Sequence, residues 1–287
     1  MEFVTLNNGV KVPMLGFGVF KIEAKDCERC VLDALEVGYR HIDTAQGYCN
    51  EKEVGAAVRA SGLKREEIFV TDKVWLSNHG YNQTKASVYH SLEIMGLDYL
   101  DLMLVHQPYA DYWGAYSALA DLQKEGVLKA IGVSNFFPWA LANLVAFHDV
   151  KPQVNQVEFN PMQQEVAAQK LASKLGVKLE AWSPFGQGQQ NLLGNPLLTE
   201  IAAKHHKSVA QVILRHIIQR GVVALAKSTH KERMQENFAI FDFSLDADDM
   251  AQIATLDTGK SMFLDHSSPE IVDFFKKFSA DLGRKLQ

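Results

Sequence analysis

The sequence lacks the features that mark extracellular, membrane-spanning or nucleic-acid-binding proteins. It has 3 cysteines in 287 residues, too few for a disulfide framework, and an odd number fits a reducing compartment. No apolar run approaches the roughly 18 residues that span a bilayer, and no basic stretch leads into an apolar core at the N-terminus. The 29 basic and 34 acidic residues give a net charge of −5 without blocks of like charge. Nucleic acid and membranes are therefore poor partners, and we expect a cytoplasmic protein that is a monomer.

Cys27 and Cys30 form a CxxC pair, a motif found in zinc sites and in redox-active proteins. No second pair completes a zinc tetrad. The pair also lies inside a segment with helical apolar spacing, Asp26–Val37, rather than at a helix start that follows a strand. We expect two buried, unreactive thiols and no metal site.

Short apolar runs alternate with longer amphipathic stretches along the chain. A hairpin comes first, in which Asn7-Asn8-Gly9 joins the strands Phe3–Leu6 and Val10–Val12. Further strands are predicted at Met14–Val19, His41–Asp43, Ile68–Lys73, Asp101–His106, Ala130–Val133, Val154–Glu158, Lys178–Trp182 and Val222–Ala226. Helices are predicted after them at Asp26–Val37, Glu51–Ala60, Asn82–Met95, Trp113–Glu125, Trp139–Phe147, Glu165–Leu175, Ser208–Gln219 and Lys231–Ala239. Two more helical patterns, Pro196–His206 and Asp246–Thr255, are insertions, and a tail over one face begins at Asp265.

This order predicts one α/β domain over residues 1–287, because no linker rich in Pro, Gly or Ser separates the repeating units. Parallel strands joined by right-handed helical crossovers close into a (β/α)8 TIM barrel of about 250 residues. A doubly wound open sheet has a similar element order, and periodicity alone does not distinguish the two. We expect the barrel, with an N-terminal β-hairpin and additional helices before the C-terminal tail.

Gly16 and Gly18 do not complete a Rossmann fingerprint, because the third glycine and the following helix start are missing. We expect these glycines to let the end of the first barrel strand pass close to a bound ligand.

Four chemically different side chains fall at the predicted strand ends, where reacting groups lie in α/β barrels. Asp43, Lys73 and His106 end the second, third and fourth barrel strands, and Tyr48 lies in the loop after Asp43. Each alone has an ordinary structural explanation, such as a turn cap or a solvated strand end. A carboxylate, an ammonium, a phenol and an imidazole on one rim together favour a catalytic site.

The motifs around these residues resemble those of the aldo-keto reductase family. They are His41-Ile-Asp-Thr-Ala-Gln-Gly-Tyr48-Cys-Asn-Glu51, Val70-Thr-Asp-Lys73-Val-Trp75, Leu104-Val-His106-Gln-Pro108, Gly132-Val-Ser134-Asn135-Phe136, Val154-Asn-Gln156-Val-Glu-Phe-Asn-Pro161, Trp182-Ser-Pro-Phe-Gly186 and Lys227-Ser-Thr-His-Lys-Glu-Arg233-Met-Gln-Glu236-Asn237. They occur in order over nearly the whole chain. The resemblance is to the bacterial branch that includes the 2,5-diketo-D-gluconate reductases.

The resemblance implies an NADPH-dependent enzyme that reduces aldehydes and ketones to alcohols by hydride transfer to the carbonyl carbon. Tyr48 is implied as the general acid, with a pKa lowered by the nearby Lys73 ammonium. Asp43 would keep Lys73 protonated, and His106 would donate a second hydrogen bond to the carbonyl oxygen.

Cofactor contacts are also implied by the resemblance. The nicotinamide is assigned to Ser134, Asn135, Gln156 and Trp182, with the ring stacked on the indole, and Ser183 is a further cofactor contact. A phosphate monoester is assigned to Lys227, Ser228, Thr229 and Arg233 at the start of a helix, and the adenine to Glu236 and Asn237. The cationic cluster predicts a preference for NADPH over NADH.

The substrate pocket is expected to be apolar, lined by Phe20, Trp75, Gln107 and Trp113. Phe20 and Gln107 stand where many family members have tryptophan. The short connection after His106 and the modest tail suggest an open site for varied small-molecule carbonyl substrates. The natural substrate stays open.

Two other functions are compatible with parts of the sequence. A nucleotide-binding regulatory barrel with little or no turnover would keep the cofactor cluster, and tight NADPH binding without turnover would identify it. A metal-dependent barrel hydrolase would need ligands such as His-x-His at the end of the first strand, and the sequence has none there.

Overall fold

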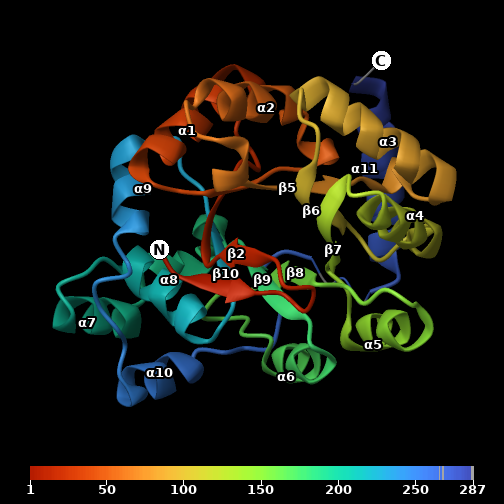
Figure 1. Cartoon of the computed structure of the whole chain (residues 1–287). Coiled ribbons are helices and arrows are strands. Elements are labelled where there is room, and N and C mark those ends of the chain that lie inside the picture. The colour runs from red at the N-terminus through yellow and green to blue at the C-terminus, as the bar shows by residue number, and fades with distance from the viewer. Residues whose placement is uncertain (265, 267, 286–287) are drawn as a thin grey trace.

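Eight parallel strands close into a barrel, and helices surround it (Figure 1). The computed structural model describes residues 1–264, 266 and 268–285. The barrel strands are β3 (Leu15–Gly18), β4 (His41–Asp43), β5 (Phe69–Val74), β6 (Leu100–Val105), β7 (Leu128–Ser134), β8 (Val154–Glu158), β9 (Lys178–Trp182) and β10 (Val223–Ala226). The last strand, β10, pairs in parallel with the first, β3, so the sheet is closed and the open-sheet alternative is wrong. The predicted (β/α)8 barrel is confirmed.

The outer helices alternate with the strands as the sequence predicts, with ends that differ by one or two residues. Those that follow barrel strands are α1 (Ala24–Val37), α2 (Glu51–Ala60), α3 (Tyr81–Met95), α4 (Tyr112–Lys124), α5 (Pro138–Phe147), α6 (Val166–Leu175), α8 (Val209–Gln219) and α9 (Lys231–Phe238). The inserted helices are α7 (Pro196–Lys204) and α10 (Ala247–Ala254). Short 3-10 turns lie at η1 (Gln46–Tyr48), η2 (Arg65–Glu67), η3 (Leu76–Asn78) and η4 (Gly186–Gly194).

Side-chain caps fix where the inserted helices begin. Asn195 accepts hydrogen bonds from two backbone N–H groups in the first turn of α7. Asp246 accepts from one such group, the N–H of Asp249, at the start of α10, and the Asp249 side chain reaches back to form a capping box. These caps satisfy N–H groups that have no partner inside the helix.

The N-terminal hairpin covers the end of the barrel opposite to the strand ends that carry the predicted site. Its strands, β1 (Phe3–Thr5) and β2 (Lys11–Pro13), pair antiparallel as predicted. The Asn7 amide at the turn donates to the carbonyl oxygens of Pro152 and Gly176, both 3.0 Å away, which precede β8 and β9. The hairpin therefore closes the bottom of the barrel and leaves the opposite end to the loops.

Cys27 and Cys30 are buried in α1, as expected from the helical spacing. Burial raises the pKa of the Cys27 thiol to about 12. A thiol in this environment stays protonated and unreactive at neutral pH.

The C-terminal tail contains a helix that the sequence interpretation did not predict, α11 (Glu270–Lys285). The residue expected to begin the tail, Asp265, lies outside the described residues. Ile271 and Phe275 are spaced by one helical turn and are buried against Trp75. In the part of the chain that the structure describes, no helix has both the length and the apolar character needed to cross a membrane.

Two glycines allow close approaches within the fold. A Cβ at Gly16 would lie 2.6 Å from Leu225 Cδ2 and 2.8 Å from His41 Nδ1. The expectation that Gly16 makes room for a ligand is therefore wrong, since its neighbours are side chains of the barrel interior. Gly55 in α2 lies against the backbone of Met95 at the end of α3, which a Cβ would overlap.

We predict that Gly55→Ala lowers the free energy of unfolding by about 1–3 kcal/mol, because backbone atoms of Met95 cannot move aside as a flexible side chain can. Urea unfolding measures the change. Gly18→Ala is the matched control, since a Cβ there would meet no atom within 4 Å. Equal stability of the two variants would contradict the close helix contact.

Candidate active site

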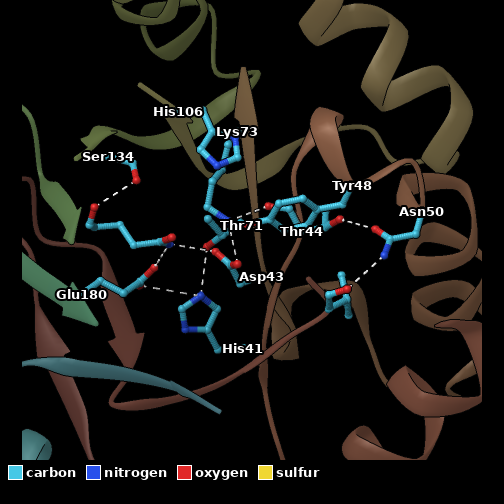
Figure 2. A network of polar contacts seen from close by, with 12 residues as sticks. His41, Asp43, Thr44, Tyr48, Asn50, Thr71, Lys73, His106, Ser134 and Glu180 are labelled. Carbon is cyan, nitrogen blue, oxygen red and sulfur yellow. Dashed lines mark hydrogen bonds and ion pairs between the residues drawn. The ribbon is translucent and has the colours of Figure 1, made fainter. Parts of the chain in front are cut away.

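A buried lysine organises the predicted catalytic residues (Figure 2). Lys73, in β5, is 0% exposed. Its ammonium donates to Asp43 Oδ1 at 2.6 Å, to the carbonyl oxygen of Thr44 at 2.8 Å and to Tyr48 Oη at 3.3 Å. An ammonium has three protons, so all of them are used. The structure thus brings Asp43, Tyr48 and Lys73 together.

The loop that carries Tyr48 is held by Asn50, a residue that the sequence analysis did not single out. Its amide donates to the carbonyl oxygens of Val19 and Ile22, both at 3.1 Å. Its Oδ1 accepts from the Thr44 hydroxyl at 2.8 Å. An Asn before a helix is usually taken as a cap, but Asn50 makes no side-chain cap hydrogen bond to α2. It instead joins the loops that follow β3 and β4.

His106 lies beside Tyr48 at the end of β6. The two rings meet edge to face with centroids 5.7 Å apart, and Trp75 contacts the imidazole at 5.0 Å. Burial lowers the pKa of His106 well below its usual value, and the Lys73 ammonium lowers it further. The imidazole is therefore neutral at physiological pH, with one ring nitrogen that carries a proton to donate.

The expected lowering of the Tyr48 pKa is wrong. Burial raises the pKa of the phenol more than the Lys73 ammonium lowers it, and Asp43 also raises it. The main physical reason is the burial of the phenol, and Asp43, whose Oδ1 lies 2.6 Å from Lys73 Nζ, offsets part of the field of the ammonium. For Lys73 itself, burial lowers the pKa, but Asp43 and Tyr48 together leave it above its usual value. The lysine is therefore fully protonated at neutral pH.

A second polar layer lies beneath Asp43 inside the barrel (Figure 2). Gln156 Nε2 donates to Asp43 Oδ2 at 2.9 Å and to Glu180 Oε1 at 2.5 Å. Glu180, in β9, is 0% exposed, and burial and the neighbouring Asp43 raise its pKa to about 8. His41 Nε2 lies 2.9 Å from Thr71 Oγ1 and 4.0 Å from Glu180 Oε2. The sequence analysis did not select Glu180, although the presence of an acidic residue inside a predicted buried strand was a signal for it.

The residues assigned to the nicotinamide form one connected group at the ends of β7 to β9. Ser134 Oγ donates to the backbone oxygen of Gln156 at 2.9 Å. The Asn135 amide donates to the carbonyl oxygen of His106 at 3.3 Å, and its Oδ1 accepts from the Trp182 indole at 2.9 Å. The Trp182 indole therefore fixes the orientation of the Asn135 amide, in addition to supplying an aromatic ring.

A bridge crosses the barrel mouth next to this group. Ser183 Oγ accepts from Gln187 Nε2 at 2.9 Å. Gln187 Oε1 accepts from Lys21 Nζ at 2.7 Å. The loops after β3 and β9 are thus connected by side chains, and Lys21 and Gln187 were not predicted.

The residues assigned to a phosphate gather where α9 begins. Lys227 and Arg233 are exposed, and neither has an ion-pair partner within the described ranges. Ser228 is buried, and its Oγ accepts from the N–H of His230, the residue before α9. Thr229 is half-buried between them. Along α9, Glu236 is exposed and Asn237 is buried.

Cavities open on both sides of the predicted site. One of about 570 Å³ is lined by Asn135, Phe136, Glu158, Trp182 and Lys260, among others. Another of about 390 Å³ is lined by Phe20, Lys21 and Tyr48, among others.

Three of the residues predicted for the substrate pocket lie near the site. The Phe20 ring is 4.9 Å from that of Tyr48, Trp75 contacts His106, and Gln107 is buried next to His106 in the sequence. Trp113 is not brought to them, because its ring packs 5.8 Å from His148. Its neighbour Tyr112 instead contacts Phe136, which lines the larger cavity, since adjacent helical residues point about 100° apart.

The C-terminal tail reaches Trp75, one of the residues predicted for the substrate pocket. Phe275 and Phe278 of α11 place their rings 6.2 and 5.6 Å from Trp75. Phe275 also contacts Tyr109 at 5.5 Å. The tail therefore forms an aromatic wall beside His106.

Comparison with known proteins agrees with this geometry. The model of the aldo/keto reductase family matches residues 14–258. A glyoxal reductase from Bacillus subtilis is 48% identical over 257 residues, covering 89% of this chain and 92% of that protein. A 9,11-endoperoxide prostaglandin H2 reductase from Trypanosoma cruzi is 44% identical over 263 residues, covering 90% and 92%.

Solved structures show the same fold. An aldo-keto reductase from a Medee basin deep-sea metagenome library superposes with a TM-score of 0.90 at 41% identity, covering 92% of this chain and 98% of that chain. A Bombyx mori aldo-keto reductase in complex with NADP has a TM-score of 0.87 at 33% identity, covering 92% and 95%. The chain therefore belongs to the aldo/keto reductase family and is an oxidoreductase of carbonyl compounds.

Proposed function

We propose that this protein, as a single domain over residues 1–287, reduces aldehydes and ketones to alcohols with NADPH, and that Tyr48 is the general acid. The observation that carries the proposal is the Lys73 ammonium, which is buried and donates to both Asp43 and Tyr48. A buried cation next to a phenol has a chemical use, because it stabilises the phenolate that remains after a proton is given away.

The cofactor fits the residues that the structure places around the barrel mouth. Lys227 and Arg233 present cationic groups without ion-pair partners among the described residues, as a phosphate monoester requires. The half-buried Trp182 and the amide of Asn135 line a cavity of about 570 Å³, which suits a planar ring with an amide substituent. The relative from Bombyx mori was solved with NADP. We propose NADPH as the preferred cofactor on this basis.

When bound, the cofactor supplies a hydride to the carbonyl carbon. The carbonyl oxygen then gains negative charge, and the Tyr48 hydroxyl donates its proton to that oxygen to form the alcohol. Lys73, 3.3 Å from Tyr48 Oη, stabilises the resulting phenolate. The neutral His106 donates a hydrogen bond to the same oxygen and orients the substrate.

The raised pKa of Tyr48 suits this role. At neutral pH the phenol is protonated in nearly every molecule, so the acid is present when the substrate binds. An alkoxide is about as basic as hydroxide, whose conjugate acid, water, has a pKa of about 15.7. Proton transfer from Tyr48 is therefore favourable once the alkoxide develops, even without a lowered pKa.

The substrate class that we propose is small aldehydes and ketones that pack against aromatic side chains. Phe20 and Trp75 contact Tyr48 and His106 from different sides, and Phe275 extends the wall. One relative is named a glyoxal reductase, and another, from Pseudomonas putida, is named a morphine 6-dehydrogenase. The two names support this substrate class without narrowing it to one compound. The cytoplasmic location and the monomeric state expected from the sequence stay predictions.

We predict that Tyr48→Phe lowers the turnover of an aldehyde panel by at least about 100-fold, because general acid catalysis contributes roughly 10²–10⁴-fold. NADPH binding, measured by quenching of protein fluorescence, should be unchanged. Tyr89→Phe is the control, since Tyr89 is exposed on α3 and bonds to Glu125. Full activity of Tyr48→Phe would exclude the phenol as the acid, and NADPH binding by a wild-type protein without turnover would favour the regulatory barrel.

We predict that Lys227→Ala combined with Arg233→Ala weakens NADPH binding by about 100-fold, because each charge-assisted hydrogen bond contributes roughly 1.5–3 kcal/mol. NADH binding should change little, since NADH lacks the phosphate monoester. Titration of both dinucleotides by fluorescence measures the effect. Lys231→Ala is the matched control, because Lys231 is paired with Glu36 at 2.7 Å. Equal weakening of NADPH and NADH would place the phosphate elsewhere.

A further inference from the structure

The amide of Gln156 is held from two sides inside the barrel. Both protons on Nε2 are donated, one to Asp43 Oδ2 at 2.9 Å and one to Glu180 Oε1 at 2.5 Å. Gln156 is 2% exposed and Glu180 0%, so water does not compete for these bonds. Since a primary amide has two protons, Gln156 has no N–H left to give to a ligand.

The opposite orientation of the amide is unfavourable. It would turn the carbonyl oxygen of Gln156 toward Asp43, which is an acceptor already paired with Lys73. Two acceptors would then face each other in a site that excludes water. The two anchors therefore leave Oε1 as the only group that Gln156 can present away from Asp43 and Glu180.

We propose that Glu180 is a positioning residue for the cofactor: with Asp43 it takes both amide protons of Gln156, so that Gln156 offers a hydrogen-bond acceptor, and no donor, to the carboxamide N–H of the nicotinamide. The proposal rests on the proposed function and on the contact between Gln156 and that carboxamide that the family resemblance implies. The inference adds Glu180, a residue that does not touch the cofactor, to the proposed function. It also adds a chemical consequence, because the site would select a cofactor that carries an N–H at this position.

The charge state of Glu180 fits this role. The groups that face it are His41 and Asp43 from β4, Lys73 from β5 and Gln156 from β8, and β10 brings no titratable side chain. Asp43 and Lys73 already balance each other, so an ionised Glu180 would leave a net negative charge in a buried site. Burial and Asp43 raise its pKa to about 8, and His41 is neutral because burial lowers its pKa to about 3. The neutral acid can still accept from Gln156 through Oε1.

The test compares the binding of NADP⁺ with that of its 3-acetylpyridine analogue, in which a methyl group replaces the carboxamide nitrogen and removes the N–H donors. Wild-type protein should bind NADP⁺ about 5- to 10-fold more tightly, the worth of one hydrogen bond. Glu180→Met keeps the length of the side chain but removes the acceptor, so Gln156 can rotate and the preference should fall below about 2-fold. Binding is measured by calorimetry, without turnover.

Further variants separate positioning from a merely structural effect. Glu180→Gln retains an acceptor oxygen and should restore the wild-type preference. Gln156→Met alone should abolish the preference, and adding Glu180→Met to it should change nothing further, because the two residues act through one amide. Asp72→Asn, at a buried acid on β5 that points to Glu51 rather than Gln156, should leave the preference intact. Glu180→Ala replaces Glu180→Met if the latter does not fold.

The free protein provides an independent measurement. The folded pKa of Glu180, about 8, lies above the value of about 4.5 expected when unfolded, so its contribution to stability is complete below pH 4.5 and is lost as the pH rises through 8. Relative to Glu180→Gln, the wild-type protein should therefore lose thermal stability between pH 5 and pH 8 and no more above pH 9. Parallel stability curves would show that the pKa of Glu180 is the same in the folded and unfolded protein, which contradicts the burial of Glu180 beside Asp43 on which the proposal relies.

The outcomes distinguish the inference from the proposed function. If wild-type protein binds neither dinucleotide, the proposed function fails and the inference fails with it. If wild-type protein prefers NADP⁺ and Glu180→Met keeps that preference, Glu180 does not position Gln156 and the inference alone is overturned. Loss of the preference in Glu180→Gln as well would show that an acceptor oxygen at this position is not sufficient to position Gln156, and would also overturn the inference.

Discussion

The buried ion pair between Lys73 and Asp43 is the interaction on which the site depends. A lone ammonium in the barrel interior would lose its proton, and a lone carboxylate would gain one. Paired at 2.6 Å, the two groups offset each other's charge and link the strands β4 and β5 near their C-terminal ends. The third proton of the ammonium is then directed at Tyr48, and the second oxygen of the carboxylate at Gln156. The catalytic layer and the layer beneath it are thus connected through one carboxylate.

The alternation of strands and helices could be predicted from the sequence because each strand is a short apolar run covered on both faces, followed by a helix of different periodicity. The expected closure of the sheet could not be derived from periodicity, since the pairing of Leu225 with Gly16 joins the two ends of the fold and leaves no local signal. The same limit applies to α11. The spacing of Ile271 and Phe275 is helical, but nothing near them in the chain indicates that Trp75 is their partner.

The grouping of Asp43, Lys73 and Tyr48 was predictable because strand ends in a barrel share one rim. The direction of the Tyr48 pKa was not, since it depends on how deeply the ring is buried and on how closely Asp43 offsets Lys73. Trp113 illustrates a third limit, because a one-residue difference in helical rotation decides whether a side chain faces the mouth or a neighbouring helix. Glu180 illustrates a fourth limit. The rule that reacting groups lie at strand ends considers only the rim of the barrel and leaves out the layer of side chains below it.

The aromatic wall beside His106 comes from α11, the last element of the chain, whereas the acid and its charged neighbours come from strands near its beginning. The residues proposed for substrate selection and those proposed for the chemistry therefore lie in segments that are far apart in the sequence. Replacing or extending the carboxyl-terminal segment can change which carbonyl compounds are accepted while the proton-transfer apparatus stays intact.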